Sequence, residues 1–271
     1  MSFAPGHVSL SFAIWKDRDP LSMGSTGIGI VLPQGVHCAV VKERSDSSEN
    51  VVISKSKEIE DPVTLRALEI LGFKDKGFTI YLRHDLPSGS GFGISGASAL
   101  AACMEVEKDL NLATRAAHQA EIEFRTGLGD VMAISSAIKN HIFPAVAIRQ
   151  EPGFNGKVEI YPLDSNFLLC ISGLGRETSK IITDENWIEI INSSGFNSQS
   201  IDTNLRSVIK MGRSFTEKSG LMTENLSEIL DQIPLGSLAT VAHLGTSIVA
   251  ISDDLDELET VLGKFGEIRK Y

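Results

Sequence analysis

A glycine-rich stretch at residues 87–99, Pro-Ser-Gly-Ser-Gly-Phe-Gly-Ile-Ser-Gly-Ala-Ser-Ala, has the composition of an anion-binding loop. A helical pattern over about 95–108 follows it directly. Loops with few side chains expose backbone N–H groups, and a helix N-terminus adds further N–H groups and a favourable dipole. No Gly-Lys-Ser/Thr follows, and the dinucleotide fingerprint is incomplete. The stretch predicts a phosphate site, most simply for a nucleotide, and the alternative is a flexible surface turn.

Ser95 stands in the first turn of that expected helix. As a plain N-cap it would satisfy one unpaired backbone N–H group. As a functional residue its hydroxyl would face the phosphates and a Mg²⁺ ion.

A second set of chemically useful side chains follows on the helix expected at 112–124. Thr114, His118, Glu121 and Arg125 are spaced at i, i+4, i+7 and i+11, so they share one stripe. In one interpretation this is a solvated face with a weak Glu121–Arg125 ion pair. In the other, Glu121 is a carboxylate directed at Mg²⁺ and His118 an imidazole facing the substrate.

Asp130 follows Thr126-Gly127-Leu128-Gly129 and precedes another helical pattern. An aspartate at this point is commonly an N-cap. The functional alternative is a carboxylate held on a tight turn beside a reacting hydroxyl.

Three isolated polar residues are further candidates: His7, Ser25 and Arg149. Arg149 ends an apolar strand, where a guanidinium either caps the sheet edge or grips a carboxylate with two hydrogen bonds. Thr178 is expected in a loop after the buried strand at 167–172.

The elements that must position these residues mix strands with helices in both halves of the chain, which predicts an α+β protein of two sub-domains. The division is expected near 150–165, giving units of 1–160 and 161–271. Strands are expected at 8–14, 27–31, 37–42, 51–54, 78–82, 145–149, 158–162, 167–172, 238–243 and 247–252, with a turn at 33–35. Helices are expected at 62–71, 95–109, 112–124, 130–140, 185–193, 200–218, 223–231 and 254–264.

Bulk composition excludes several classes of function. The net charge is −10 and no basic tract occurs, which argues against nucleic-acid binding. The three cysteines lie far apart in apolar runs, as expected for reduced, packed thiols in a cytoplasmic protein. No apolar run approaches the ~20 residues that span a bilayer. An acidic protein that binds an anion needs local cations, so a few arginines should matter greatly.

Taken together, these motifs resemble the GHMP small-molecule kinases. The family's Ala-Pro-Gly motif corresponds to Ala4-Pro5-Gly6, and its phosphate loop to residues 87–97. Within the family, the order of Pro5-Gly6-His7, Gly24-Ser25, the 126–131 motif and Ile148-Arg149 is similar to archaeal pantoate kinases. The resemblance implies a two-lobed fold, with an N-terminal lobe like domain 2 of ribosomal protein S5 and a ferredoxin-like C-terminal lobe.

The resemblance also implies roles for individual residues. ATP would be held through Pro87, Gly89, Ser90, Gly91, Phe92, Gly93, Ser95, Gly96 and Ala97. Mg²⁺ would be bound by Ser95 and Glu121, and Asp130 would be the catalytic aspartate. Pantoate, phosphorylated on the way to coenzyme A, would contact Ser25, His118, Arg149 and Thr178.

The chain departs from the family pattern at several points. Ile94 replaces a serine of the phosphate loop, His7 stands where mevalonate kinases carry a lysine, and 244–247 is a reduced third motif. The alternatives are therefore a homoserine or mevalonate kinase, or a regulator of the same fold that binds ligand without catalysis. A homodimer is one option for the assembly.

Overall fold

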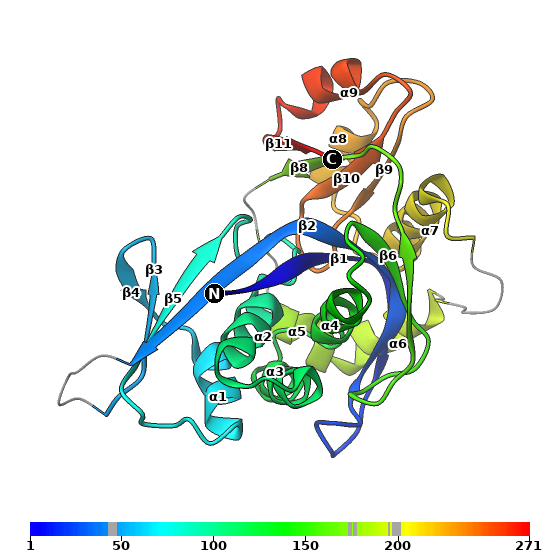
Figure 1. Ribbon diagram of the computed structural model, residues 1–271. Helices are drawn as coiled ribbons and strands as arrows, with labels where there is room; N and C mark the ends of the chain where they lie inside the picture. The colour runs from blue at the N-terminus through cyan, green and yellow to red at the C-terminus, as the bar shows by residue number, and fades with distance from the viewer. Residues whose placement is uncertain (43–47, 173–174, 176–177, 195, 197–201) are drawn as a thin grey trace.

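The computed structural model describes the 271 residues except 43–47, 173–174, 176–177, 195 and 197–201 (Figure 1). The first half contains β1 (Ser2–Trp15), β2 (Gly24–Lys42), β3 (Val51–Ser54), β4 (Lys57–Ile59), α1 (Pro62–Ile70), β5 (Phe78–His84), α2 (Ile94–Val106), α3 (Leu110–Phe124), α4 (Asp130–Asn140), β6 (Ala145–Arg149) and β7 (Val158–Pro162). The second half contains β8 (Leu168–Ile171), α5 (Thr178–Thr183), α6 (Glu185–Ser193), α7 (Leu205–Lys218), α8 (Glu224–Leu230), β9 (Leu238–Val241), β10 (Ile248–Ile251), α9 (Leu255–Leu262) and β11 (Glu267–Lys270).

The long strand β2 is the centre of a seven-stranded sheet ordered β4-β3-β5-β2-β6-β7, with β1 also paired to β2. β1 occupies one edge of β2, and the other edge is shared by β6 at residues 27–31 and β5 at residues 36–42. Pro33 lies at the changeover between these two partners, where its missing N–H group costs no ladder bond. The turn predicted at 33–35 is therefore wrong: the chain continues as one strand.

The two faces of β1 differ in polarity: one presents apolar side chains and the other presents polar side chains. Leu10 and Phe12 pack against α7, where Gly212 leaves room for Leu10 and Phe215 contacts the ring of Phe12. His7 and Ser9 instead form hydrogen bonds with the guanidinium of Arg149. The polar face of β1 is therefore turned toward the ends of α4 and β6, and the apolar face toward the second half of the chain.

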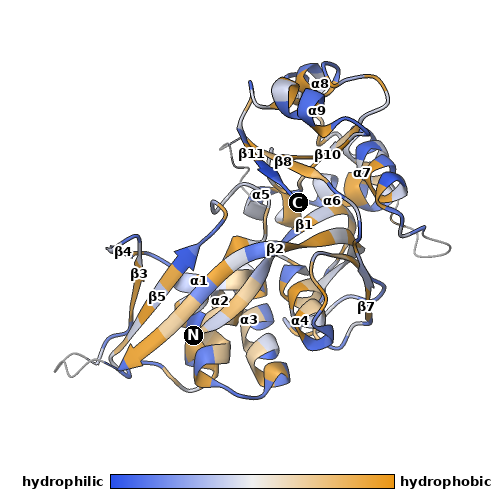
Figure 2. Cartoon of the chain, turned by 45° about the horizontal axis from the view of Figure 1, so that its top comes forward, coloured by the Kyte–Doolittle hydropathy of each residue, from blue (hydrophilic) through white to orange (hydrophobic). Residues whose placement is uncertain are grey.

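The second sheet has the antiparallel order β11-β8-β10-β9, and α7 and α9 pack against it. Figure 1 shows this sheet above the first one, whose helices α1 to α4 lie on the opposite side of β1 and β2. One hydrophobic cluster runs through both, since it includes Leu10 from β1, Leu100 from α2, and Phe167 and Val249 beside or within the second sheet. The hydropathy colouring of Figure 2 shows the apolar stretches of β1 and β2 next to α2. The division at 160/161 remains a prediction.

Most predicted elements agree with the observed ones, and the differences are short or at ends. β4, α5 and β11 were not predicted. Thr178, expected in a loop, begins α5. The helix expected from 200 begins at Leu205, and 200–201 lie outside the described residues. Among the described helices, none is long and apolar enough to cross a membrane.

The C-terminal residue Tyr271 links the two sheets. Its ring stacks on Phe167 with 4.9 Å between centroids, and its hydroxyl donates to Oε1 of Gln34 on β2 over 2.5 Å. Backbone hydrogen bonds of 3.0 Å in both directions join Tyr271 to Phe167.

We expect Tyr271→Phe to lower the free energy of unfolding by about 1 kcal/mol, the value of one hydrogen bond. Tyr271→Ala should cost about 2–3 kcal/mol because the stacked ring is lost as well. Urea unfolding monitored by circular dichroism measures both. Tyr161→Phe, which removes an exposed hydroxyl that donates to Glu159, is the control and should change stability by less than about 0.5 kcal/mol. Equal losses for the Tyr161 and Tyr271 phenylalanine variants would contradict the linking role.

Candidate active site

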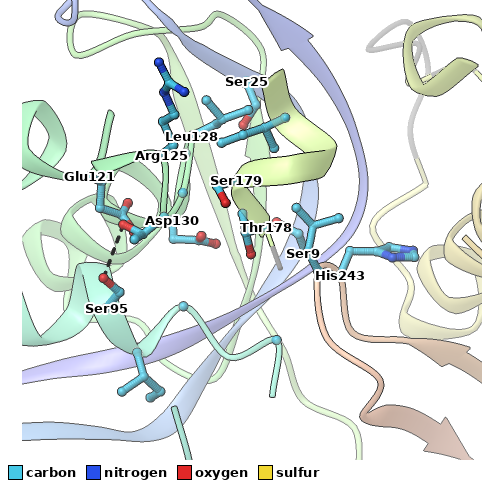
Figure 3. A pocket seen from close by; sticks show the side chains of 18 of the residues that line it. Ser9, Ser25, Ser95, Glu121, Arg125, Leu128, Asp130, Thr178, Ser179 and His243 are labelled. Carbon is cyan, nitrogen blue, oxygen red and sulfur yellow. Dashed lines mark hydrogen bonds between the residues drawn. The ribbon is translucent and has the colours of Figure 1, made fainter. Parts of the chain in front are cut away.

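A pocket of about 380 Å³ opens between the two halves of the chain. The glycine loop, the end of α3, the start of α4 and the helix α5 surround it, as Figure 3 shows. Its polar and glycine lining residues are Ser9, Ser25, Gly89, Gly91, Gly93, Ser95, Glu121, Arg125, Thr126, Gly127, Gly129, Asp130, Thr178, Ser179 and His243. The apolar ones are Phe12, Phe92, Ile94, Phe124, Leu128, Ile182 and Leu244.

The glycine loop reaches the pocket in a conformation that requires glycine. Gly89, Gly91 and Gly93 have φ values of 80°, 90° and 61°, in the left-handed region. Gly93 is the N-cap of α2 and offers no side-chain cap, so the first N–H groups of the helix are open to a ligand. The loop is also held from the second half of the chain: a Cβ at Gly91 would lie 2.6 Å from the carbonyl oxygen of Ala242.

The predicted phosphate-binding residues divide into two groups. Gly89, Gly91, Phe92, Gly93 and Ser95 line the pocket. Pro87, Ser90, Gly96 and Ala97 do not line it. Gly96 has a different use, because a Cβ there would lie 2.8 Å from Cδ of Glu121. Phosphate contacts of Pro87, Ser90, Gly96 and Ala97 remain a prediction, and the structure shows Gly96 packed against Glu121.

Ser95 is not the cap of α2, since Gly93 holds that position. Its hydroxyl donates to Oγ1 of Thr126 over 3.3 Å, the bond drawn in Figure 3. Both hydroxyls face the pocket from different elements. The capping interpretation of Ser95 is wrong, and its oxygen is positioned to meet a ligand.

Glu121 is a buried carboxylate with 1% of its surface exposed, and among the described residues neither of its oxygens has a hydrogen-bond partner. Gly96 and Gly127 make its room: a Cβ at Gly127 would lie 2.5 Å from Oε1. The interpretation as a solvated face is wrong, and Arg125 instead ends the helix in a left-handed conformation. Burial, and then the charge of Asp130, raises the pKa of Glu121 well above 4.5.

An unpartnered carboxylate beside a hydroxyl is a donor set that fits a hard cation such as Mg²⁺. Among the described residues, no group of three or more His, Cys, Asp or Glu side chains could hold a metal ion by itself. Mg²⁺ commonly binds through one or two carboxylates together with substrate phosphates and water. Glu121 and Ser95, next to the glycine loop, satisfy that requirement.

Asp130 is the first residue of α4, and Gly129 is the N-cap. The N-cap interpretation is therefore wrong. Its carboxylate enters the pocket with its side chain 20% exposed, and Oδ1 lies 2.6 Å from Nδ1 of His7. Burial alone would raise the pKa of Asp130. The hydrogen bond from His7, the attraction to that ring in its protonated form and the positive charge of Arg149 oppose this effect, so the pKa is lowered and the carboxylate is anionic.

Two predicted substrate contacts, Arg149 and His118, lie behind the pocket wall. Arg149 is 2% exposed and touches Nε2 of His7 at 3.2 Å and Oγ of Ser9 at 3.3 Å. Gly129 separates it from the pocket, because a Cβ at that residue would lie 2.7 Å from Nε of Arg149. Nε itself has no partner.

His118 is fully buried, and its Nε2 donates to the carbonyl oxygen of Met23 over 3.1 Å. Burial lowers its pKa to about 4, so the ring is neutral. Met23 is two residues before Ser25, which lines the pocket, as does Thr178 on α5. Of the four predicted substrate contacts, Ser25 and Thr178 line the pocket, while His118 and Arg149 do not, and the substrate contacts themselves remain a prediction.

Sequence reasoning missed most of the apolar wall, which includes Phe12, Phe124, Leu128 and Ile182. Leu128 belongs to the motif at 126–131, in which the glycines and Asp130 carry the functional signal. The others come from β1, α3 and α5, which are far apart in the chain. Their single apolar side chains carry no signal that separates a pocket wall from a core.

The chain matches known proteins at the level of family. Residues 62–137 match the GHMP kinases N terminal domain. A pantoate kinase of Methanocaldococcus jannaschii is 31% identical over 260 residues, covering 92% of each chain. A pantoate kinase of Methanospirillum hungatei is 28% identical, covering 99% of this chain and 92% of the relative.

Solved structures agree in fold. A phosphotransferase related to the CoA biosynthesis pathway has a TM-score of 0.80 at 22% identity, covering 99% of this chain and 94% of the other. Mevalonate kinase of L. major, solved with R-mevalonate, has a TM-score of 0.64 at 14% identity, covering 100% and 94%. The two-lobed α+β fold implied by the resemblance is confirmed, and the chain belongs to the GHMP kinase family.

Proposed function

We propose that this protein is a pantoate kinase, which transfers the γ-phosphoryl group of ATP to the primary hydroxyl of pantoate and forms 4-phosphopantoate for coenzyme A synthesis. One observation carries the proposal: a glycine loop at a helix N-terminus, an unpartnered buried carboxylate and an anionic aspartate open on the same pocket. The similarity to relatives named pantoate kinase over nearly the whole chain supports the choice of acceptor.

Phosphoryl transfer needs positioning and charge neutralisation more than covalent chemistry. The glycine loop and the first N–H groups of α2, which no side chain caps, would bind the β- and γ-phosphates of ATP. Ser95 and Glu121 would hold Mg²⁺. When bound, that ion neutralises charge that develops on the phosphate oxygens.

Asp130 would orient the primary hydroxyl of pantoate and accept its proton as the new O–P bond forms. The bond between the γ-phosphorus and the bridging oxygen breaks at the same time, and ADP leaves with the electron pair. A carboxylate with a lowered pKa suits a proton that moves late, when the attacking oxygen is already bonded to phosphorus.

Pantoate combines an anionic end with a bulky apolar centre, and the pocket offers a counterpart to each. Ser25 and Thr178 would contact its oxygens directly, while the geminal dimethyl group would pack on Phe12, Leu128 and Ile182. Arg149 would attract the carboxylate from beneath Gly129, in a low-dielectric position where its charge is little screened. His118 would act indirectly, because its hydrogen bond to the carbonyl of Met23 fixes the backbone two residues before Ser25.

The most direct test measures ADP release with pantoate, homoserine or mevalonate as acceptor, each with ATP and Mg²⁺. We expect kcat/KM for pantoate to exceed the other two by at least about 100-fold, since each mismatched polar or apolar group costs a few kcal/mol. Turnover of homoserine or mevalonate at the pantoate rate would reject the assignment of substrate. ATP binding without turnover of any acceptor would indicate a non-catalytic regulator.

Asp130→Asn should lower kcat by about 100- to 10,000-fold, because the amide cannot accept the proton. The KM for ATP should change little, since Asp130 faces the acceptor. Steady-state kinetics with both substrates varied measures this. Asp164→Asn, on an exposed loop, is the matched control. A variant of Asp130 with near-normal kcat would remove the base from the mechanism.

Glu121→Gln should separate stability from activity. Because the pKa of Glu121 is raised in the folded state, the stability that this group contributes is complete below pH 4.5 and is lost as the pH rises from there. Without Mg²⁺, the variant should therefore melt at a higher temperature than the parent at neutral pH and at the same temperature near pH 4. Its kcat should fall at least about 100-fold.

Glu189→Gln, an exposed glutamate of α6, is the control for the melting series. Magnesium with a non-hydrolysable ATP analogue should stabilise the parent more than the Glu121→Gln variant. Two results would contradict this prediction: a variant that melts below the parent at neutral pH, and a variant that magnesium and the analogue stabilise as much as they stabilise the parent. Together they would show that the charge of Glu121 does not destabilise the fold and that Glu121 is not a metal ligand.

A further inference from the structure

Two buried side chains, Arg149 and His7, form an unbroken chain of polar contacts with Asp130, whose carboxylate enters the pocket. Arg149 lies 3.2 Å from Nε2 of His7, and Nδ1 of the same ring lies 2.6 Å from Oδ1 of Asp130. Arg149 and His7 are 2% and 0% exposed, so water does not compete for these contacts. The three residues come from β6, β1 and α4, and only the folded protein brings them together.

The contacts determine which nitrogen of His7 carries the proton. A guanidinium has only N–H donors, so Nε2 of His7 must accept, and an accepting nitrogen carries no hydrogen. Nδ1 therefore carries the proton and donates it to Asp130. Burial lowers the pKa of His7, in agreement with a neutral ring.

The surrounding backbone leaves room for this arrangement. A Cβ at Gly129 would lie 2.7 Å from Nε of Arg149 and 2.5 Å from Oγ of Ser25, so any larger residue would displace the guanidinium. Between Pro5 and His7 the pairing of β1 shifts register, because the partner strand β2 carries extra residues between Val31 and Gly35. Such bulges commonly redirect a side chain beside an active site. The backbone N–H of His7 also donates to the carbonyl of Phe92 over 2.9 Å, which links it to the glycine loop.

We infer that His7 is a positioning residue for Asp130, and that Arg149 holds His7 in the one neutral tautomer able to do this. The inference rests on the proposed function for its catalytic meaning. A neutral donor fixes Oδ1 of Asp130 without placing a second full charge against it, and leaves Oδ2 for the hydroxyl of the acceptor. Among the described residues no hydrogen bond to Oδ2 occurs. A neutral histidine therefore positions Asp130 with a smaller loss of basicity than a cation would cause. A cationic side chain at the same place would form an ion pair with the carboxylate and make it a weaker base.

Two substitutions of His7 separate the hydrogen bond from the bulk of the ring. In His7→Asn the amide nitrogen takes the place of Nδ1 and can still donate to Asp130, whereas His7→Leu fills the space with no donor. We expect His7→Leu to lower kcat about 100-fold with little change in the KM for ATP, and His7→Asn to recover at least about 10-fold of that loss. His141→Asn, an exposed histidine in a left-handed conformation that asparagine tolerates, is the control.

A second measurement reads the tautomer without any turnover. In ¹⁵N-histidine spectra of the ligand-free protein, the signal of His7 is assigned as the one that disappears in His7→Asn. In the parent protein, we expect this signal to have the chemical shifts of a neutral ring protonated at Nδ1. In Arg149→Met the same signal should change toward the Nε2-protonated form, because nothing then holds Nε2 as an acceptor. A His7 ring that is protonated at Nε2 or doubly protonated in the parent would overturn the inference, as would normal kcat in His7→Leu.

These readouts distinguish failure of the inference from failure of the proposed function. If another alcohol is the true acceptor, pantoate fails in the ADP assay, while the tautomer is unaffected and the kcat comparison is made with that alcohol. If no acceptor is phosphorylated, the positioning role is overturned together with the kinase assignment, even with the tautomer as expected.

Discussion

The 2.6 Å hydrogen bond between His7 and Asp130, with Arg149 behind it, is the constraint on which the site depends. Two carboxylates, Glu121 and Asp130, lie within a protein of net charge −10, and the buried guanidinium of Arg149 is their nearby counter-charge. Burying charges without such compensation would cost several kcal/mol. The compensation is unequal: Asp130 gains the hydrogen bond and remains anionic, whereas Glu121 has no partner until a cation arrives. The same cluster therefore holds one anionic carboxylate and one buried carboxylate with a raised pKa, which we propose as the base and as a magnesium ligand.

The fold supplies this arrangement through β1 and β2. β1 turns Leu10 and Phe12 to α7 and presents His7 and Ser9 to Arg149, with a shift in its register on β2 between Ser9 and Ser11. β2 brings Arg149 into register, since Gly27 pairs with it on the neighbouring strand β6. A slip by one residue in either pairing would exchange the two faces, and would place charge in the hydrophobic cluster. Core packing and site geometry are thus fixed by the same strand register.

Much of the fold could be predicted because local signals were strong. The strands β3, β6 and β7 were predicted at their observed bounds, as was α6. β2 was divided in two because Pro33 and Gly35 signal a turn locally, and only the exchange of partners from β6 to β5 explains why the strand continues. α5 was missed because six residues are too few for a helical period to show.

For the site, the sequence predicts Ser95, Glu121 and Asp130, whose neighbours in the chain include glycines, and the structure brings all three to one pocket. It could not tell whether a polar residue faces the pocket or lies behind its wall. Arg149 and His118 differ from Ser25 in this respect only through packing between elements distant in sequence. Both lie one layer behind the pocket wall, and their part in holding the substrate remains a prediction.

The close approach of the glycine loop to the second half of the chain has an evolutionary consequence. A Cβ at Gly245 would lie 2.3 Å from the backbone of Ser90, so the loop keeps its shape only while the segment at 242–245 stays in place. α5, which supplies Thr178 and Ile182 to the pocket, belongs to that same half. A change of acceptor achieved by exchanging the C-terminal half between relatives would therefore disturb the loop proposed for the nucleotide as well. New acceptors are more readily gained by single substitutions in α5 and β1 than by recombination of lobes.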